Sequence, residues 1–430
     1  MTTDSRTQRI AIIGGGAAGF FLAINLKEMS PMIEVCIFEK SRKILSKVEI
    51  SGGGRCNCTN SFEDVRDMKT VYPRGDKLMK RLFKEFDNHD AYKWFEEHGV
   101  PLVTQDDHCV FPQSQDSHSI INCFTAHAHK YGIKTERSCP CTSIEPAPEG
   151  GYILCFAKED GASISKHFDK VAITTGGSPL RKGLDWLERL GHSIVDPVPS
   201  LFTFNIKSAE LRHLMGTVVE NATASIPATK FRATGPLLIT HWGMSGPAVL
   251  KLSSYAARHL SDNSYKSPLA VNWTGESDTN KVIDHIAETA EENSNKQLSS
   301  VRPYNIPQRL WEYLIGKCEL KREKRWGELG KKGVNRIANI LTNDTYVIEG
   351  KSAFREEFVT CGGVSLTSVN MSTMESKTCP GMFFAGEVLD IDGITGGFNF
   401  QAAWTTAYRA AKSMAVGGVD DDPISLLLIS

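Results

Sequence analysis

The run RIAIIGGGAAGFFLAINLKEM, residues 9–29, restricts the fold more than any other part of the chain. An apolar stretch of β type, Ile10–Ile13, leads into glycines and then into a helical pattern. The glycines have the spacing Gly14-x-Gly16-x-x-Gly19, the dinucleotide fingerprint in its context of strand, turn and helix. These glycines permit the turn, the approach of a pyrophosphate and close helix packing, so the sequence predicts a Rossmann-type unit.

A second apolar strand, IEVCIF, ends at Glu39 and is followed by Lys40. Glu39 lies 20 residues past Gly19, where an acidic side chain hydrogen-bonds a ribose diol. An acidic residue at this point favours an adenosine ribose with free hydroxyls over a 2′-phosphate, and it is compatible with both NAD and FAD. The plainer alternative is a glycine-rich turn in a βαβ unit that binds no ligand.

The C-terminal block CPGMFFAGEVLDIDGITGGFNFQAAW has the same order of strand, glycine turn and helix. A predicted strand, Met382–Ala385, ends in Gly386 and Glu387, and the turn at Gly396–Gly397 precedes a helix that begins near Asn399. The arrangement suits a flavin dinucleotide with its adenine at the first motif and its isoalloxazine towards this block. Glu387 would face the ribityl or phosphate region, and the N-terminus of the helix would stabilise an anionic reduced flavin.

Together these blocks resemble the two-dinucleotide-binding-domain flavoproteins of the glutathione reductase type. More closely, they resemble a bacterial family of aminoacetone-oxidase-like or NAD(P)/FAD-dependent flavoproteins. The resemblance rests on IIGGGAAG, KVEISGGGRCNCTN, VFPQS, GPLLITHWGMSGPAVL and GEVLDIDGITGGFNFQAAW, and it covers nearly the whole chain. Cys58 and Phe398 depart from the residues more frequent in the family. The resemblance implies non-covalent FAD in a domain interrupted by a large insert, and it leaves the reaction open between amine oxidation and reduction of unsaturated substrates.

The loop ISGGGRCNCTN, residues 50–60, is a specific part of that resemblance. In flavoproteins of this type the loop crosses the pyrophosphate, so Gly52–Gly54 would let the backbone approach FAD. Arg55 would contact phosphate or reach the substrate, and Asn57 would hydrogen-bond the cofactor. Cys56 is a weak redox candidate because it lacks a CxxC partner. Gly53→Val is expected to abolish FAD retention while the fold stays intact.

The predicted fold class is α/β, with a Rossmann-like FAD domain interrupted by an insert that has an antiparallel, barrel-like β part and a helical part. The FAD domain takes residues 1–195 and 355–430, the β-rich part 196–277 and the helical part 278–354. His241 and Trp242 lie in the most site-like segment of the insert, where they form either a wall of the substrate cavity or a hinge with a core tryptophan.

The overall charge gives little indication of a polyanionic partner. The formal net charge is −1, so no global field attracts nucleic acid or an anionic membrane. The run KCELKREKRWGELGKK is locally basic; solvated helix surface is the default interpretation and an RNA-contacting patch the alternative. With no membrane-length apolar run and no apolar signal core at the N-terminus, we expect a cytoplasmic protein. The 11 scattered cysteines suggest neither a disulfide framework nor a metal site.

The function predicted from sequence is a soluble FAD-dependent oxidoreductase of a small organic molecule, oxidase-like, with hydride transfer to or from flavin N5. One alternative is an NAD(P)H-dependent reductase of an unsaturated substrate; another is a flavin redox sensor or RNA-associated protein. No second GxGxxG follows an apolar strand in residues 60–360, so NADH or NADPH would bind only transiently. Nucleic acid is not the expected partner, and no oligomeric state follows from the sequence.

The candidate site residues fall into two groups. The substrate-side candidates are Arg55, His241 and Trp242, and no catalytic base is named. The cofactor-binding candidates are Gly14, Gly16, Ala17, Ala18, Gly19, Glu39, Lys40, Gly53, Gly54, Arg55, Cys56, Asn57, Cys141, Thr175, Gly176, Gly386, Glu387, Gly397, Phe398 and Asn399. Thr175 and Gly176 belong to the run VAITTGGSPL, an apolar strand whose end would pack under the dinucleotide.

Overall fold

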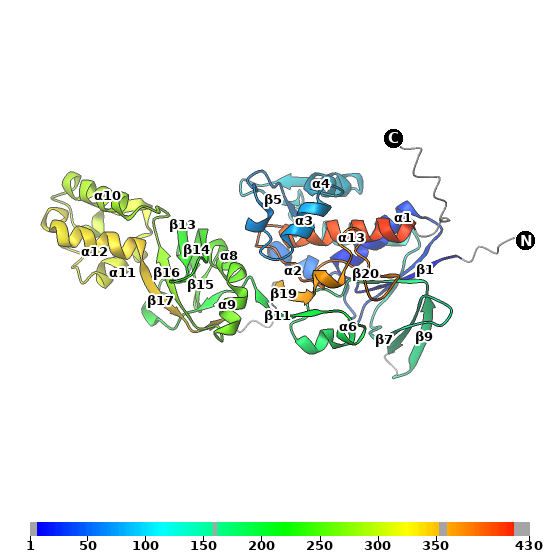
Figure 1. The fold of residues 1–430 in the computed structure, drawn as a ribbon. Helices are drawn as coiled ribbons and strands as arrows, with labels where there is room; N and C mark the ends of the chain where they lie inside the picture. Colours follow the sequence, from blue (N-terminus) through cyan, green and yellow to red (C-terminus); the bar gives the residue numbers. More distant parts are fainter. Residues whose placement is uncertain (1–6, 158–160, 352–358, 417–430) are drawn as a thin grey trace, which may run out of the picture. The chain divides into compact units, whose positions relative to one another are not determined.

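The chain consists of two compact units in a computed structural model that describes residues 7–157, 161–351 and 359–416 (Figure 1). Unit 1 combines Met1–Pro197 with Val359–Ser430, and unit 2 is Val198–Phe358. The expected end of the insert at residue 355, and the apolar C-terminal run ISLLLIS, lie outside the described residues. Within the described part of the chain, none of the helices has the length and apolarity needed to cross a membrane.

Unit 1 is built on a parallel sheet of five strands, in the order β20-β10-β1-β2-β6. The four strands other than β6 are short, mostly apolar runs that are largely buried, as expected for parallel strands covered by helices, whereas β6 is a polar strand at one edge of the sheet. The strands are β20 (Met382–Phe384), β10 (Lys170–Ile173), β1 (Arg9–Ile13), β2 (Glu34–Phe38) and β6 (Lys134–Glu136). This sheet confirms the predicted α/β, Rossmann-like class.

Two helices from opposite ends of the chain pack against each other in unit 1 (Figure 1). They are α1 (Ala17–Met29), which follows the first glycine turn, and α13 (Phe398–Val416), which follows the second. Phe21 of α1 and Trp404 of α13 are fully buried, with ring centroids 5.1 Å apart. This packing brings the N-terminal and C-terminal motif blocks into one layer.

The rest of unit 1 surrounds this core with helices and two small antiparallel sheets, β3-β5-β4 and β7-β8-β9. Its remaining elements are α2 (Ser46–Gly54), β3 (Thr59–Asn60), η1 (Met68–Thr70), α3 (Asp76–Leu82), α4 (Asn88–Glu97), β4 (Leu102–Thr104), β5 (Cys109–Pro112), α5 (His118–Lys130), β7 (Cys141–Pro146), β8 (Tyr152–Ala157), β9 (Ser163–Phe168), η2 (Arg181–Leu184), α6 (Asp185–Arg189), β19 (Val359–Val364) and η6 (Leu366–Ser368). The strand β11 (Ile194–Ser200) begins in unit 1 and ends in unit 2.

Unit 2 contains an antiparallel sheet of seven strands that closes on itself. Residues 344–351 pair with β16 through their first part and with β12 through their last part, so one run of chain joins the two ends of the sheet. The strands are β12 (Phe204–Asn205), β13 (Val218–Ser225), β14 (Arg232–Ile239), β15 (Gly243–Ser245), β16 (Ser267–Asn272), β17 (Asp344–Ile348) and β18 (Gly350–Lys351). The predicted barrel-like part is confirmed, although its closing strands lie within residues 278–354, the range assigned to the helical part.

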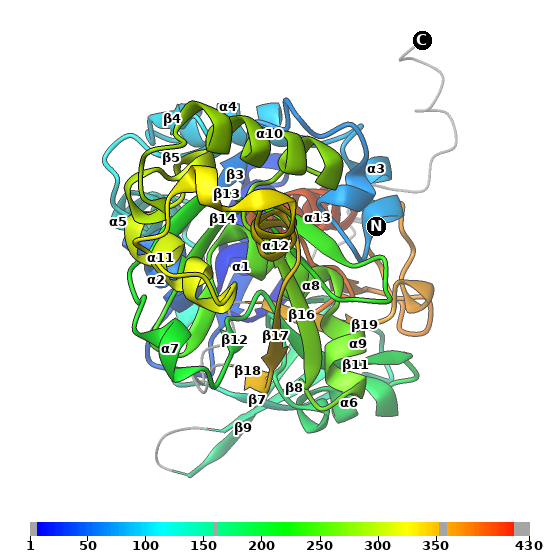
Figure 2. The ribbon, with the colours of Figure 1, turned by 90° about the vertical axis from the view of Figure 1, so that its left-hand side faces the viewer.

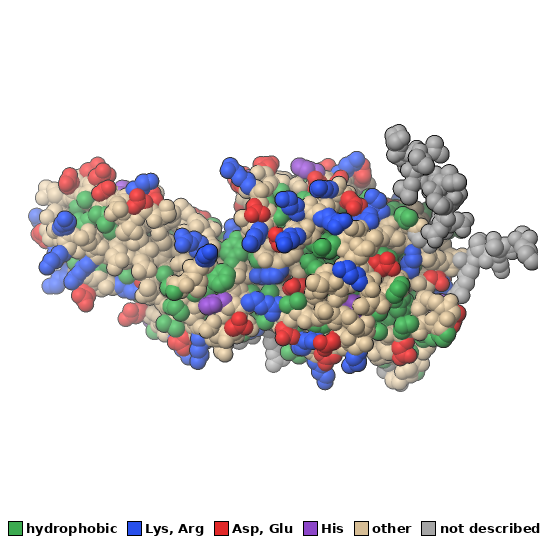
Figure 3. Space-filling view, in the orientation of Figure 1, with side chains coloured by type: hydrophobic (Ala, Val, Ile, Leu, Met, Phe, Trp, Pro, Cys, Tyr) green, Lys and Arg blue, Asp and Glu red, His purple; other side chains and the backbone are tan. Residues whose placement is uncertain are grey.

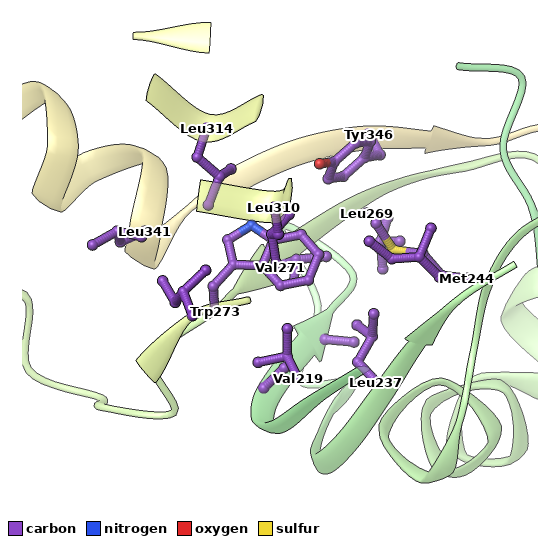
Figure 4. Packing of buried hydrophobic residues seen from close by; sticks show 14 of the residues in the cluster. Val219, Leu237, Met244, Leu269, Val271, Trp273, Leu310, Leu314, Leu341 and Tyr346 are labelled. Atoms are coloured by element: carbon purple, nitrogen blue, oxygen red, sulfur yellow. The ribbon is translucent and has the colours of Figure 1, made fainter. Parts of the chain in front are cut away.

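Helices cover unit 2 on two sides: α8 packs on β13 and β14, and α12 packs on β16 (Figure 2). The helices are α7 (Ala209–Arg212), α8 (Pro247–Tyr255), α9 (Ala257–Asp262), α10 (Thr279–Glu292), η3 (Leu298–Ser300), η4 (Pro303–Asn305), α11 (Gln308–Lys317), η5 (Trp326–Glu328) and α12 (Gly330–Thr342). One hydrophobic cluster joins Val219 and Leu237 of the sheet to Leu310, Leu314 and Leu341 of the helices (Figure 4). The β-rich and helical segments therefore share a core.

His192 is a buried histidine of unit 1 that joins α6 to the segment before β20. Its Nδ1 lies 2.9 Å from the Leu187 carbonyl oxygen, which can only accept, so Nδ1 donates; in the neutral ring Nε2 then accepts from Ser376 Oγ at 2.8 Å. This arrangement uses the neutral ring. Burial lowers the pKa of His192 below its ordinary value, although the hydrogen bond to Leu187 opposes the shift.

We predict that His192 makes unit 1 less stable in mild acid. The unfolded chain binds a proton below about pH 6.5 while the folded histidine resists it, so stability falls as the pH drops below that value. His192→Gln should reduce the difference between melting temperatures measured at neutral and at mildly acidic pH. His129→Gln, at an exposed histidine of α5, should leave that difference as it is in the wild-type protein.

Candidate functional site

The first glycine turn is closed by packing within the protein. Gly14 has φ of +118°, and a Cβ there would lie 2.3 Å from the Thr174 carbonyl oxygen. A Cβ on Gly19 would lie 2.1 Å from the Gly14 carbonyl oxygen. Thr174 Oγ1 donates to the carbonyl oxygens of Ile13 (3.1 Å) and Gly14 (2.9 Å). These two glycines are therefore required by the turn itself.

Gly16 is different, because nothing in the protein requires it to be glycine. Its φ of −94° and ψ of −167° are accessible to any residue. Among the described residues other than Gly16 and its two neighbours in the chain, no atom lies within 4 Å of the position of an added Cβ. Gly16 is also the N-cap of α1, and no side chain caps the helix there. The open space thus lies at the positive end of a 13-residue helix, which fits a phosphate group.

Glu39 is fixed beside this turn at the end of β2. Its Oε2 accepts from the Gly15 N–H at 2.8 Å, and its Oε1 accepts from Ser41 N and Oγ at 2.8 and 2.7 Å. Lys40 is exposed next to it. Cys141 lies at the start of β7, whose entry is tied to β2 by a hydrogen bond from Cys139 N–H to the Glu39 carbonyl oxygen at 2.9 Å. The carboxylate of Glu39 is therefore held next to the glycine turn by Gly15 and Ser41.

The three consecutive glycines form a left-handed turn at the end of α2. Ser51 leaves the helix with ψ of 149°, and Gly52, Gly53 and Gly54 have φ of 57°, 69° and 85°. Such values strain any residue with a side chain. Glycine at 53 is thus explained by the backbone alone. This changes the expectation for Gly53→Val, since valine would strain the turn whether or not FAD binds.

Two side chains of this loop are engaged by the protein. Arg55 stacks on the Phe111 ring, with 4.2 Å from its guanidinium carbon to the ring centre, and Nε donates to the Gly52 carbonyl oxygen at 3.1 Å. The Asn57 amide, oriented to satisfy its neighbours, donates to the Thr59 carbonyl oxygen at 2.9 Å and accepts from Gly397 N–H at 3.2 Å. Asn57 therefore links the loop to the second glycine turn, a contact that the sequence did not reveal.

Cys56 and Cys58 are fully buried free thiols. Burial raises the pKa of Cys56 to about 12 and that of Cys58 well above its ordinary value. Both thiols are therefore protonated near neutral pH, and only thiolates are nucleophilic. The redox role considered for Cys56 has no support in this geometry.

We predict that Cys155 reacts with iodoacetamide well before Cys56 or Cys58. Cys155 is partly exposed on β8, and hydrogen bonds from Ser143 and Ser165 lower its pKa. Peptide mapping after brief alkylation near neutral pH should find the label on Cys155, and on Cys56 only after unfolding. Labelling of Cys56 at the rate of Cys155 would contradict the burial described above.

The end of β20 approaches the start of α1. Gly386 has φ of +77°, and a Cβ there would lie 2.9 Å from the Ala18 Cβ. Both carboxylate oxygens of Glu387 have a partner. Oε1 accepts from Thr360 N–H at 2.8 Å, and Oε2 lies 2.8 Å from Lys47 Nζ. Lys47 was not recognised from sequence, because 340 residues separate it from its partner.

The second glycine turn precedes α13. A Cβ on Gly397 would lie 2.1 Å from the Thr59 carbonyl oxygen. The Asn399 side chain accepts from Gly393 N–H at 2.8 Å and donates to the Gly393 carbonyl oxygen at 2.9 Å, so it braces the turn. Phe398 packs edge-on against Phe62, with 5.1 Å between ring centres.

A buried ion pair supports the same turn. Arg74 Nε donates to Asp392 Oδ1 at 2.6 Å, and a second guanidinium nitrogen binds the other oxygen. Asp392 is completely buried. Burial alone would lower the pKa of Arg74, but the adjacent Asp392 outweighs that effect and raises it. No sequence signal connected these two residues.

The remaining candidates are more exposed. Thr175 is exposed at the end of β10, where Gly176 has φ of +73° and open space around an added Cβ. His241 and Trp242 are exposed in the turn between β14 and β15 of unit 2, with ring centres 4.7 Å apart. Unit 1 therefore gathers the cofactor candidates from the two glycine turns, while His241 and Trp242 form a separate feature of unit 2.

Comparison with known proteins covers almost the whole chain. Residues 8–413 match the model described as "HI0933-like protein Rossmann domain". The ribosomal RNA dihydrouridine synthase of Haemophilus influenzae is 27% identical, over 94% of this chain and 98% of that protein. The 3-dehydro-bile acid delta(4,6)-reductase of Clostridium scindens is 24% identical, over 95% of this chain and 99% of that protein.

A solved structure shares the fold: the 3-ketosteroid-delta4-(5alpha)-dehydrogenase of Rhodococcus jostii RHA1 has a TM-score of 0.52 at 12% identity. The match covers 96% of this chain and 98% of that one. The open space at Gly16, at the N-terminus of α1, fits the phosphate groups of a flavin dinucleotide. The chain belongs to the HI0933-like Rossmann-domain family, and it is an FAD-dependent oxidoreductase.

Proposed function

We propose that the chain is a reductase that adds hydrogen across a carbon–carbon double bond conjugated to a carbonyl group, with a uracil ring in RNA as its substrate. NADH or NADPH would bind transiently and supply the electrons. This proposal departs from the oxidase-like chemistry, and from the absence of a nucleic-acid partner, that were expected from sequence.

The observation that carries the proposal is the near full-length similarity to relatives named for such reductions. The relatives from Haemophilus influenzae and Escherichia coli are named ribosomal RNA dihydrouridine synthases, and each is 27% identical over 94% of this chain. Dihydrouridine differs from uridine by two hydrogens on a ring double bond next to a carbonyl group. The bile acid relative is named for reduction of a delta(4,6) ketone, which is chemically similar.

The residues of unit 1 would hold FAD along one path. Gly16 and the start of α1 would bind the pyrophosphate, Glu39 the adenosine ribose, and the turn at Gly386 and Gly397 the flavin end. When bound and reduced, FAD supplies the hydride for this chemistry. The N-terminus of α13 faces this end with its positive partial charge, which would favour the reduced, anionic form.

The balance of the reaction defines what the protein must provide. The π bond breaks, one carbon gains a hydride and the neighbouring carbon gains a proton. The protein must therefore hold the flat ring still, exclude bulk water and deliver that proton. Trp242 offers an exposed ring on which a base could stack, and Arg55 and His241 are proposed as further substrate-side residues.

A small unsaturated ketone is the second candidate substrate, favoured by the similarity to the bile acid reductase over 95% of this chain. Reduction of such a ketone would need no polyanion-binding surface. The two candidates therefore differ in whether RNA binds.

The test is anaerobic incubation of the purified yellow protein with NADH or NADPH and with RNA transcribed without modifications. We expect digested RNA to contain uridine heavier by two hydrogen atoms, and we expect none when the reductant is omitted. Flavin that NADH and NADPH both fail to bleach would exclude the proposed electron donors. Rapid reduction of a bile-acid-type enone together with unchanged RNA would favour the second candidate.

A further inference from the structure

We propose that a basic face of unit 2 docks the phosphate backbone of the RNA substrate; this inference rests on the proposed function. The basic face is defined as the exposed or partly exposed side chains of Lys321, Arg322, Lys324, Arg325, Lys331, Lys332 and Arg336. It occupies the segment between α11 and α12 and the first part of α12.

Charge is distributed unevenly along the chain. The whole sequence has 49 basic and 50 acidic residues, but residues 198–351 have 20 basic and 15 acidic residues. Residues 321–336 alone contain seven basic residues and two acidic ones. Acidic side chains of unit 2 are instead frequent on α10, at Asp284, Glu288, Glu291 and Glu292. Figure 3 shows a group of Asp and Glu side chains in the region of α10. A local positive field thus exists within a neutral chain.

The backbone holds this face in place. Trp326 is fully buried and stacks on Trp311, with ring centres 6.1 Å apart and planes 7° from parallel. Residues 322–326 also pair with residues 296–299 through three backbone hydrogen bonds of 2.8 to 3.2 Å. The basic side chains therefore project from an ordered segment, which lowers the entropy cost of binding a polyanion.

Most of the positive charge is available to a ligand. In the described part of the chain, Lys321, Lys324, Lys331 and Lys332 make no ion pair. Arg322 pairs with Glu312 at 2.6 Å and Arg336 with Glu319 at 3.6 Å, but both arginine side chains are more than half exposed, so these pairs contribute little and can be exchanged for a ligand. Lys317 is excluded from the face because it binds the buried carboxylate of Asp344.

Lys331 and Lys332 lie in the first turn of α12, a helix of 13 residues whose N-terminus has no side-chain cap. Cations are disfavoured at this end of a helix, so these lysines do not serve helix stability. Two ammonium groups beside free backbone N–H groups are suited to phosphate.

The features of the face favour RNA over other anionic partners. Among the described residues, the large exposed apolar side chains all lie outside residues 321–336. An anionic membrane surface or an acidic protein partner is usually bound with apolar anchors as well as charges. Phosphate contacts need charge alone, and they supply most of the non-specific affinity for nucleic acid.

The test compares two lysine pairs with a matched control pair in FAD-loaded, oxidised protein. The test variants are Lys331→Gln/Lys332→Gln and Lys321→Gln/Lys324→Gln. The control, Lys230→Gln/Lys281→Gln, also removes two positive charges from exposed positions of unit 2. Binding of protein-free ribosomal RNA is measured by fluorescence anisotropy over a range of salt concentrations. For each test variant we expect roughly tenfold weaker binding at low salt, and a salt slope smaller by about 1.4 to 1.8.

Equal affinity of the test and control variants, or a wild-type protein that does not bind ribosomal RNA, would overturn the proposal. So would competition by phosphatidylserine vesicles at equal charge concentration, which would identify a membrane surface instead. Oxidised protein cannot reduce RNA, so binding is measured independently of the reaction. If the test variants bind RNA more weakly but the wild-type protein does not hydrogenate RNA, the docking face is supported and the proposed function is rejected.

Discussion

Gly16→Ala should give a folded protein that has lost most of its FAD. The new methyl group meets no described protein atom within 4 Å, and the backbone at Gly16 is extended, so the apo fold has no reason to change. A pyrophosphate against the N-terminus of α1 would occupy the space that the methyl group takes. Overpacking of this kind costs about 2 kcal/mol, which corresponds to roughly thirtyfold weaker binding. Visible flavin absorbance after gel filtration, and FAD titration of the apoprotein, measure the effect.

Two further glycines provide the controls. Gly316→Ala on α11 also places a methyl group in open space, far from any glycine turn in the sequence, so it should leave FAD content unchanged and should not lower the melting temperature, since alanine favours the helix over glycine. Gly19→Ala creates a contact of 2.1 Å with the Gly14 carbonyl oxygen, so it should lower the melting temperature of the apoprotein itself. If Gly16→Ala binds FAD as the wild-type protein does, the assigned path of the dinucleotide is wrong.

The glycine spacing at 14, 16 and 19 predicted the central sheet of unit 1, because strand, turn and helix are encoded within about 20 neighbouring residues. The meaning of the glycines was harder to predict. Glycine was expected at positions 52–54 because a ligand would approach the backbone there. The positive φ values of Gly52–Gly54 instead explain these glycines by the backbone conformation. Only the geometry distinguishes these glycines from Gly16.

Contacts between residues far apart in the chain are the second feature that could not be predicted from the sequence. Asn57 contacts the turn at Gly397, and Lys47 pairs with Glu387. Asn57, Gly397 and Glu387 were candidates in their own segments, but no sequence pattern paired them across the chain. The residues that close the sheet in unit 2 were not identified for the same reason, because they too pair with a distant segment. The strand formed by residues 344–351 follows helices and was assigned to the helical part of the insert, and its pairing with β12 depends on residues about 145 positions away.

Asp392→Ala should be among the most destabilising single substitutions in unit 1. It leaves the guanidinium of Arg74, whose side chain is only 17% exposed, buried without its carboxylate. Removing one partner of a buried pair costs about 3–5 kcal/mol. Because the chain has two units, hydrogen exchange of backbone amides in β20 and α13 measures the effect better than a global melt. We expect faster exchange there and unchanged exchange in unit 2.

An exposed pair supplies the matched control for this prediction. Glu34 lies 2.7 Å from Lys134 and 3.5 Å from Arg9 at the surface of the same unit, so Glu34→Ala should cost no more than about 1 kcal/mol. The double variant Arg74→Met/Asp392→Leu removes both charges and should recover much of the protection lost in Asp392→Ala. If Asp392→Ala exchanges no faster than Glu34→Ala, the buried pair does not hold the second glycine turn, and the stability of that turn must come from Asn57 and Asn399.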